Sequence, residues 1–148
     1  MEAEDRKQAL PTRTKAFAGM VIRFFMSLDK QREEIRVIGR QLIRSGTSVA
    51  ANYREASRSR SNEEFVSKID ICSQEADETQ LWLELLRDEC GITSSMIDPI
   101  WKESDELICI SETMSKKHQE QNKLNSSNPT SLLTQDSSFQ HHPLPLFL

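Results

Sequence analysis

The sequence is poor in the residues that build β folds, disulfide scaffolds and membrane spans. Its 148 residues include only 4 glycines, 5 prolines, 6 phenylalanines, 2 tryptophans and 1 tyrosine, which is little material for a turn-rich β architecture. The cysteines, Cys72, Cys90 and Cys109, are odd in number and lack C-x-x-C spacing, so we expect free thiols in a reducing compartment. No apolar run approaches the ~20 residues of a membrane span, and the polar start carries no secretory signal. These absences predict a cytoplasmic protein of one domain with no membrane partner.

Signatures of catalysis and of metal binding are also missing. The histidines are His118, His141 and His142, and none follows a glutamate at the Glu-x-x-His spacing of di-metal helical bundles. No predicted helix pairs a Ser or Cys with a His base, and no glycine-rich phosphate loop is present. Glu75 and Glu78 could act as an acid and a base, but a solvated or salt-bridged helix face is the better interpretation. We therefore expect no enzyme activity and no cofactor.

Four segments do carry apolar residues at helical spacing. The predicted helices run from Thr12 to Leu28, from Gln31 past Ala56, from Ser61 to a C-cap at Gly91, and from Ser95 to Lys123. Ser61 and Glu64 fit a capping box at the start of the third helix. The pattern predicts an all-α, up-down-up-down four-helix bundle over residues 12–123. A flexible N-terminus (1–11) and a disordered, Ser/Asn/Pro/Gln-rich tail (124–148) are predicted to flank it.

The stretch RSGTSVAANYREASRSRS, residues 44–61, crowds small residues into the second predicted helix. The apolar stripe from Ile35 through Val49 and Tyr53 crosses it in steps of three and four, which predicts continuous helix rather than a loop. Tyr53 is expected on the core side of that helix. Gly46, at the edge of the stripe, would let a neighbouring helix come close.

Charge is distributed unevenly along the chain. The net charge is -4, but residues 1–60 hold 13 Lys and Arg against 7 Asp and Glu, whereas residues 61–148 hold 6 against 16. At 100° per residue, six arginines of the second helix share an arc opposite its apolar stripe. The candidate nucleic-acid-binding residues are therefore Arg32, Arg36, Arg40, Arg44, Arg54 and Arg58. Two uses remain open for this arc: contact with RNA phosphates, or ion pairs with acidic helices of the same or a neighbouring subunit.

The third helix carries a second candidate surface. Leu81, Trp82 and Leu85 lie beside or opposite its core stripe. An apolar patch outside a small bundle usually marks an interface, so we expect these residues at a homo-oligomer contact. The alternative is that the fourth helix or the tail covers them.

Several motifs in order resemble one bacterial four-helix-bundle family. RVIGRQLIRSGTSVAANYREASRSRS (36–61), EADETQLWLELL (75–86) and TRTKAFA (12–18) are similar to the family that includes proteins encoded within 23S rRNA intervening sequences. The resemblance extends from Thr12 to Lys117. It implies a left-handed bundle that assembles into a cyclic homopentamer. It also implies kinship with the accessory variability determinant proteins of diversity-generating retroelements, which are pentamers that bind a reverse transcriptase and RNA through a basic surface.

The resemblance also marks individual positions. The matching residues are Gly39, Arg40, Arg44, Ser45, Gly46, Ser48, Asn52, Tyr53, Arg54 and Glu55 in the second helix, and Glu75, Ala76, Glu78, Trp82 and Leu83 in the third. Ser57 and Ser59 depart from the family pattern, where small apolar residues or Cys are commoner. The chain itself, RNA and a reverse transcriptase are therefore the expected partners. A structural protein-interaction module without nucleic-acid binding is the alternative.

Overall fold

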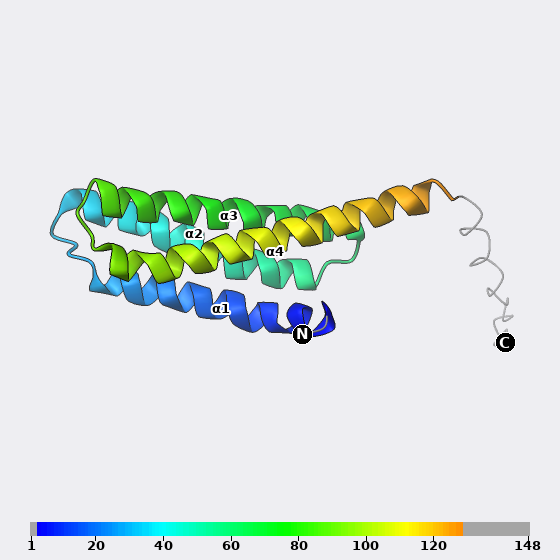
Figure 1. The fold of residues 1–148 in the computed structure, drawn as a ribbon, viewed down its shortest axis with the longest axis horizontal. Helices are drawn as coiled ribbons and strands as arrows, with labels where there is room; N and C mark the ends of the chain where they lie inside the picture. The colour runs from blue at the N-terminus through cyan, green and yellow to red at the C-terminus, as the bar shows by residue number, and fades with distance from the viewer. Residues whose placement is uncertain (1–2, 129–148) are drawn as a thin grey trace, which may run out of the picture.

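A computed structural model describes residues 3–128 of the chain, and the side chains of residues 10–128. Its helices are α1 (Ala3–Ser27), α2 (Glu33–Ser57), α3 (Asn62–Asp88) and α4 (Ser94–Ser126), and no strand occurs between residues 3 and 128. Successive helices run in opposite directions (Figure 1). The predicted all-α, up-down-up-down four-helix bundle is therefore confirmed.

Each helix buries one apolar stripe against the others. The side chains that are at most 2% exposed include Phe17 and Val21 of α1, Leu42 and Val49 of α2, Ile69 and Leu83 of α3, and Ile97 and Leu107 of α4. The stretch from residue 44 to residue 57 is helical throughout, as the unbroken stripe predicted. Tyr53 lies in this core and is 6% exposed.

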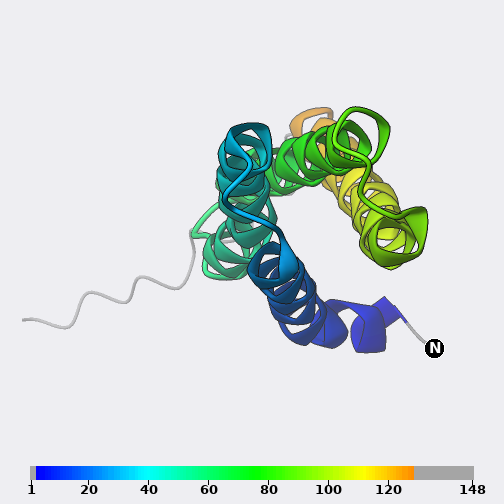
Figure 2. The same ribbon diagram turned by 90° about the vertical axis from the view of Figure 1, so that its left-hand side faces the viewer.

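The helix boundaries differ from the prediction at both ends of the bundle. α1 begins at Ala3 rather than Thr12 and contains Pro11. Leu10 is 4% exposed, so the apolar stripe of α1 extends about two turns before Phe17. Pro11 cannot donate a backbone hydrogen bond, and the first turns lie off the axis of the rest of α1 (Figure 2). α4 continues to Ser126, so the helix includes the first residues of the predicted tail; residues 129–148 of that tail lie outside the described part of the chain.

The predicted start signal of α3 is confirmed, whereas the helix ends at Asp88 with Glu89 as its C-cap, two residues before the predicted C-cap Gly91. The Ser61 hydroxyl accepts a hydrogen bond from the Glu64 backbone N–H at 3.1 Å. The Glu64 carboxylate accepts from the Arg60 N–H at 3.1 Å, one residue earlier than in a standard capping box. Gly91 has a φ of 73°, a left-handed conformation in which glycine carries no steric penalty. The chain therefore turns sharply after α3 and leads directly into α4.

The bundle is closed more firmly on one side than on the other. α2 and α3 contact each other most extensively, whereas α1 and α4 contact each other least. Viewed from the end, the four helices form an arc whose open side lies between α1 and α4 (Figure 2). Arg13 bridges this side, because its guanidinium contacts the carboxylates of Glu103, at 2.6 Å, and of Glu106.

The longest helix, α4, runs past the end of α1 (Figure 1). No residue of α4 after Ser115 is buried. The start of α3 contacts this end through Asn62, whose side-chain amide donates to the His118 carbonyl at 3.0 Å and to the Asn122 side chain at 2.6 Å. None of the described helices combines the length and the apolar character that crossing a bilayer requires.

Candidate nucleic-acid interface on α2

The structure divides the six predicted arginines into two groups. In the first group, an ion pair holds each guanidinium. Arg32 contacts Glu34 at 2.6 Å and donates to the Cys90 carbonyl at 3.0 Å, and Arg36 contacts Glu33. Arg32 is the N-cap of α2, with extended backbone angles, so it precedes the helical arc on which it was predicted.

Arg44 belongs to the same group and links α2 to α3. Its guanidinium contacts Glu75 at 3.2 Å and Glu78 at 2.5 Å. The Glu78 carboxylate also accepts a hydrogen bond from the Trp82 indole at 3.3 Å. The hydrogen bond from Arg44 lowers the pKa of Glu78 below its ordinary value. Glu75 and Glu78 thus form the salt-bridged helix face that the sequence favoured over an acid-base pair.

The second group is Arg40, Arg54 and Arg58. None of these three guanidiniums lies within 4.0 Å of a carboxylate belonging to residues 10–128. Arg54 and Arg58 are one helical turn apart at the C-terminal end of α2. The negative end of the helix dipole favours cations at this position. The dipole amounts to roughly half a charge, however, and does not neutralise two arginines.

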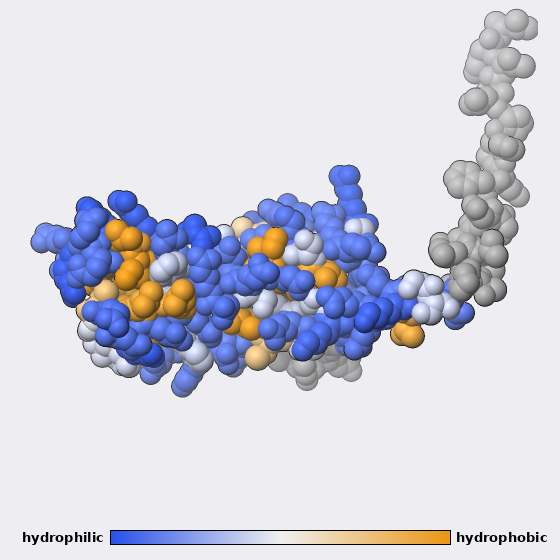
Figure 3. All heavy atoms as spheres, turned by 90° about the horizontal axis from the view of Figure 1, so that it is seen from above, coloured by the Kyte–Doolittle hydropathy of each residue, from blue (hydrophilic) through white to orange (hydrophobic). Residues whose placement is uncertain are grey.

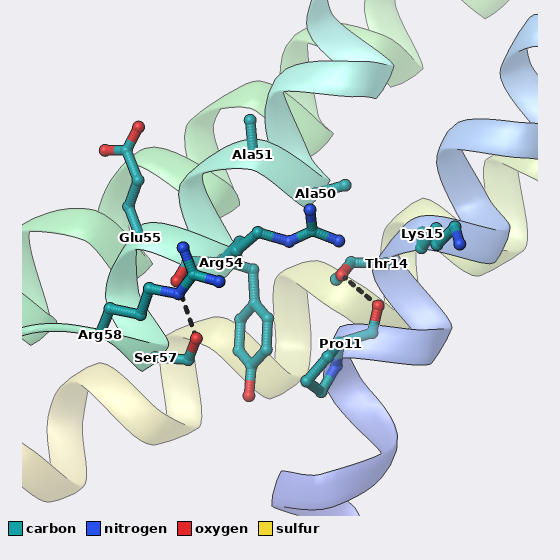
Figure 4. A pocket seen from close by; sticks show the side chains of 10 residues that line it. Pro11, Thr14, Lys15, Ala50, Ala51, Arg54, Glu55, Ser57 and Arg58 are labelled. Atoms are coloured by element: carbon teal, nitrogen blue, oxygen red, sulfur yellow. Dashed lines mark hydrogen bonds between the residues drawn. The ribbon is translucent and has the colours of Figure 1, made fainter.

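These two arginines lie beside a hollow between α1 and α2, which we call the α1–α2 hollow. Its volume is about 450 Å³, and it is lined by Arg54, Arg58, Ala50 and Ala51 of α2 and by Pro11 and Lys15 of α1, among others. The Arg54 side chain extends from α2 toward Thr14 of α1, and Ala50 points toward α1 (Figure 4). The hollow therefore has a small apolar floor and three cations around it.

One carboxylate also lines the α1–α2 hollow. Glu55 points away from the guanidiniums of Arg54 and Arg58 (Figure 4) and pairs instead with Lys68 of α3 at 2.5 Å. The lining therefore carries three cations and one carboxylate, and that carboxylate is paired with a lysine outside the hollow. The local charge is consequently positive on a chain whose net charge is -4.

Close packing beneath α2 positions this surface. A β-carbon added at Gly46 would meet the Val21 side chain at 2.7 Å, so the glycine is what permits α1 to approach. On the α3 side, the hydroxyls of Ser45 and Thr79 are 2.8 Å apart and both are 0% exposed. Burial raises the pKa of the Tyr53 phenol. Small residues therefore fix the helix positions that form the hollow.

Reasoning on one helix at a time missed the contribution of α1. Lys15 and Pro11 line the hollow, although neither belongs to the predicted arc. An available signal was the antiparallel register: the start of α1 lies opposite the end of α2, so Lys15 faces the turn that carries Arg54.

The predicted interface residues differ in exposure. Leu81 is 47% exposed, whereas Trp82 and Leu85 are half-buried and Trp82 packs against the core. Val37 of α2 is 50% exposed. Apolar side chains gather toward the end of the molecule where α2 begins and α3 ends (Figure 3). The α3 surface thus retains apolar area that no described residue covers.

The cysteines and His118 lie outside the α1–α2 hollow. Cys72 and Cys90 are buried free thiols and Cys109 is exposed, and desolvation raises the pKa of Cys72 to about 12. The His118 ring packs on Phe65 with a centroid distance of 4.3 Å. Within residues 3–128, no group of three or more His, Cys, Asp or Glu side chains is placed to hold a metal ion.

Comparison with known proteins agrees with this architecture. Residues 10–122 match the profile of the family described as 23S rRNA-intervening sequence protein. The structure resembles the crystal structure of a protein of unknown function from the S23 ribosomal protein family, from Bacteroides thetaiotaomicron VPI-5482. The two chains are 32% identical with a TM-score of 0.69, and the match covers 74% of this chain and 97% of that one. A search of curated proteins gave no match. The matched profile spans all four helices, and the chain belongs to the 23S rRNA-intervening sequence protein family.

Proposed function

We propose that the protein is a non-catalytic, RNA-associated helical bundle that contacts RNA phosphates through the second half of α2. The observation that carries this proposal is the cluster of Lys15, Arg54 and Arg58, whose charges no nearby described carboxylate neutralises. Bare cations of this kind exchange condensed counterions for phosphates, which drives sequence-independent RNA binding. The family to which the chain belongs takes its name from intervening sequences of 23S rRNA, which supports RNA as the polyanion.

The chemistry of the surface favours phosphate contact over base recognition. The aromatic residue of α2 is Tyr53, which is 6% exposed and cannot offer its face to a base. Guanidinium and ammonium groups bind phosphate strongly but carry no sequence information there. We therefore expect similar affinity for unrelated RNA sequences.

We also infer that the protein self-associates in the cytoplasm. Leu81 and Val37 leave exposed apolar area on the outside of a small bundle, which favours an interface. A homopentamer is the assembly that the family resemblance implies, and a reverse transcriptase is a further partner to test. Light scattering of the full chain at tens of micromolar measures the assembly, and a monomer would contradict this inference.

The decisive test of RNA association compares two triple variants of equal charge change. In the first, Lys15, Arg54 and Arg58 become Gln; in the control, the ion-paired Arg32, Arg36 and Arg44 become Gln. RNA affinity is measured by filter binding over a range of salt concentrations. In a plot of log binding constant against log salt concentration, we expect the first variant to make the negative slope shallower by roughly 2 to 3. Each lost phosphate contact reduces the size of this slope by about 0.7 to 0.9. The control should change the slope by less than 1.

A second function is supported by the first group of arginines. Arg44 joins α2 to α3 of the same chain through two carboxylates, as expected if the arc served to hold helices together rather than to bind RNA. In that case the control triple would lose its oligomeric state in sizing experiments, and the parent would hold no RNA at physiological salt. That result would leave a structural interaction module as the function.

A further inference from the structure

We propose that the α1–α2 hollow is a discrete pocket for one phosphate group of a nucleotide or an RNA strand, held by Arg54 and Arg58 of α2 and by Lys15 of α1. The inference rests on the proposed function and deepens it, because it names the chemical group that this part of the surface takes. It differs from a diffuse basic stripe in requiring two helices and a concave shape.

The charges around the α1–α2 hollow favour a bound anion. Arg54 and Arg58 are like charges at i and i+4, an arrangement that destabilises an isolated helix. Lys15 adds a third positive charge from the other side. Glu55 is 2.5 Å from Lys68 and is turned toward α3. A phosphate at this position would therefore meet three cations and relieve their mutual repulsion.

The shape of the α1–α2 hollow suits a nucleotide better than a bare ion. Its volume of about 450 Å³ lies in the lower part of the range for small-molecule sites, about 300 to 1,000 Å³. Pro11, Ala50 and Ala51 supply an apolar wall beside the cations. A phosphate could bind at the arginines while the attached sugar packs on this wall.

Arg40 provides a matched control on the same helix. It also lacks an ion pair within the described side chains, but it does not line the hollow. Fourteen residues separate it from Arg54, a distance of about 21 Å along a helix. A diffuse electrostatic surface would respond equally to the loss of either arginine, whereas a pocket would respond to Arg54 alone.

The experiment titrates the full-length protein with inorganic phosphate, 5′-AMP, adenosine and a short oligoribonucleotide without terminal phosphates. Binding is measured by calorimetry and by ³¹P NMR. Arg54→Gln is compared with Arg40→Gln to remove one charge inside or outside the hollow. Ala50→Met is compared with Ala16→Met, which adds the same side chain at an exposed site of α1. Thermal unfolding of each variant shows that the fold is retained.

We expect 5′-AMP to bind and adenosine not to bind. Arg54→Gln and Ala50→Met should each weaken 5′-AMP binding about tenfold, and both controls should change it less than twofold. Binding of the oligoribonucleotide with the same dependence would assign the pocket to internal phosphodiesters of RNA. Binding of inorganic phosphate and 5′-AMP alone would assign it to free phosphate monoesters.

The outcomes also separate this proposal from RNA association itself. If the oligoribonucleotide binds but Arg54→Gln and Arg40→Gln weaken it equally, the pocket is wrong and RNA association stands. If 5′-AMP binding depends on Arg54 and no RNA binds, RNA association is wrong and the pocket stands as a nucleotide site. If neither ligand binds, or if adenosine binds as well as 5′-AMP, the phosphate pocket is wrong.

Discussion

The two halves of α2 carry arginines at similar spacing but in opposite electrostatic states. In the first half, Arg36 and Arg44 each contact a carboxylate. At the other end, Arg54 and Arg58 line a hollow without such a contact among the described side chains. Arg40 has no ion pair among the described side chains; the hydrogen bond from Arg36 is the main cause of the lowered pKa of Glu33, and the charge of Arg40 adds a smaller part.

This contrast shows that a row of arginines on one helix face is not electrostatically uniform. In the first half, Glu33 of α2 pairs with Arg36, and Glu75 and Glu78 of α3 pair with Arg44, whereas Arg40 has no such pair among the described side chains. The second half faces α1, which contributes Lys15 rather than a carboxylate. Neighbouring helices, rather than α2 itself, therefore decide which arginines remain available to a partner.

The prediction with the largest expected effect concerns the core beneath the second half of α2. Tyr53→Ala should lower the free energy of unfolding by about 3 to 5 kcal/mol, as for other large buried aromatics, because Tyr53 is 6% exposed. Chemical denaturation measures the change. Tyr53→Phe keeps the ring and is the control. A loss below about 1 kcal/mol for the alanine variant would mean that the ring contributes little to the core.

The next effect compares a glycine from each half. Gly46→Ala should destabilise by about 1 to 3 kcal/mol, because the new β-carbon would lie 2.7 Å from the stiff side chain of Val21. Gly39→Ala meets Phe25 at 3.2 Å and gains about 1 kcal/mol in helix propensity, so its net effect should stay within about 1 kcal/mol. Equal losses in thermal or chemical unfolding would show that close approach does not distinguish the two halves.

A smaller effect isolates the ion pair that defines the first half. In a double-mutant cycle, Arg44→Gln and Glu78→Gln should show a coupling energy of about 0.5 kcal/mol, typical of a partly exposed pair. Replacing Arg40 instead of Arg44 should give a coupling with Glu78 close to zero. Coupling of the same size in both cycles would remove the distinction between paired and unpaired arginines.

The smallest effect is a pH dependence of stability. The Arg44 hydrogen bond holds the pKa of folded Glu78 below its ordinary value of 4.5, so the unfolded chain binds this proton more readily. The stabilisation is present above about pH 4.5 and is lost as the pH falls through the lower, folded pKa. In Glu78→Gln, the loss of unfolding free energy on acidification should be smaller than in the parent by a few tenths of a kcal/mol. The effect is small because the Glu78 side chain is 34% exposed and solvent screens its ion pair. Denaturant titrations from pH 6 to pH 3 measure the free energy of unfolding of the parent and of the variant. An equal loss of stability with falling pH in both proteins would contradict the assignment.

Much of the fold follows from local patterns in the sequence. The stripe through Val49 and Tyr53 predicted continuous helix across the small residues, and Ser61 predicted the start of α3 through capping chemistry. Gly91 predicted the turn after α3, although the helix ends with Glu89 as its C-cap. α1 was predicted to begin at Thr12, but it begins at Ala3 and contains Pro11. A core contact made by Leu10 extends the helix past that residue.

The candidate site was predictable in part. Periodicity placed the arginines on one face of α2, but whether a cation is paired depends on other helices. Glu75 and Glu78 reach Arg44 because α3 lies beside it. Lys15 lines the α1–α2 hollow because the start of α1 lies beside the end of α2. These contacts are tertiary, and helical phase alone contains no information about them.

The end of α4 has a consequence for motion on the timescale of amide exchange. No side chain of the helix beyond Ser115 is buried, and Asn62 of α3 makes hydrogen bonds to the His118 carbonyl, the His118 ring and the Asn122 side chain. Opening of these last turns exposes little apolar surface, so it needs far less free energy than unfolding the bundle. Amides after Ser115 should therefore exchange with solvent through local fraying, whereas amides near Leu107 should exchange only when the whole bundle unfolds. The boundary between these two exchange mechanisms along α4 should lie near the residues that Asn62 contacts.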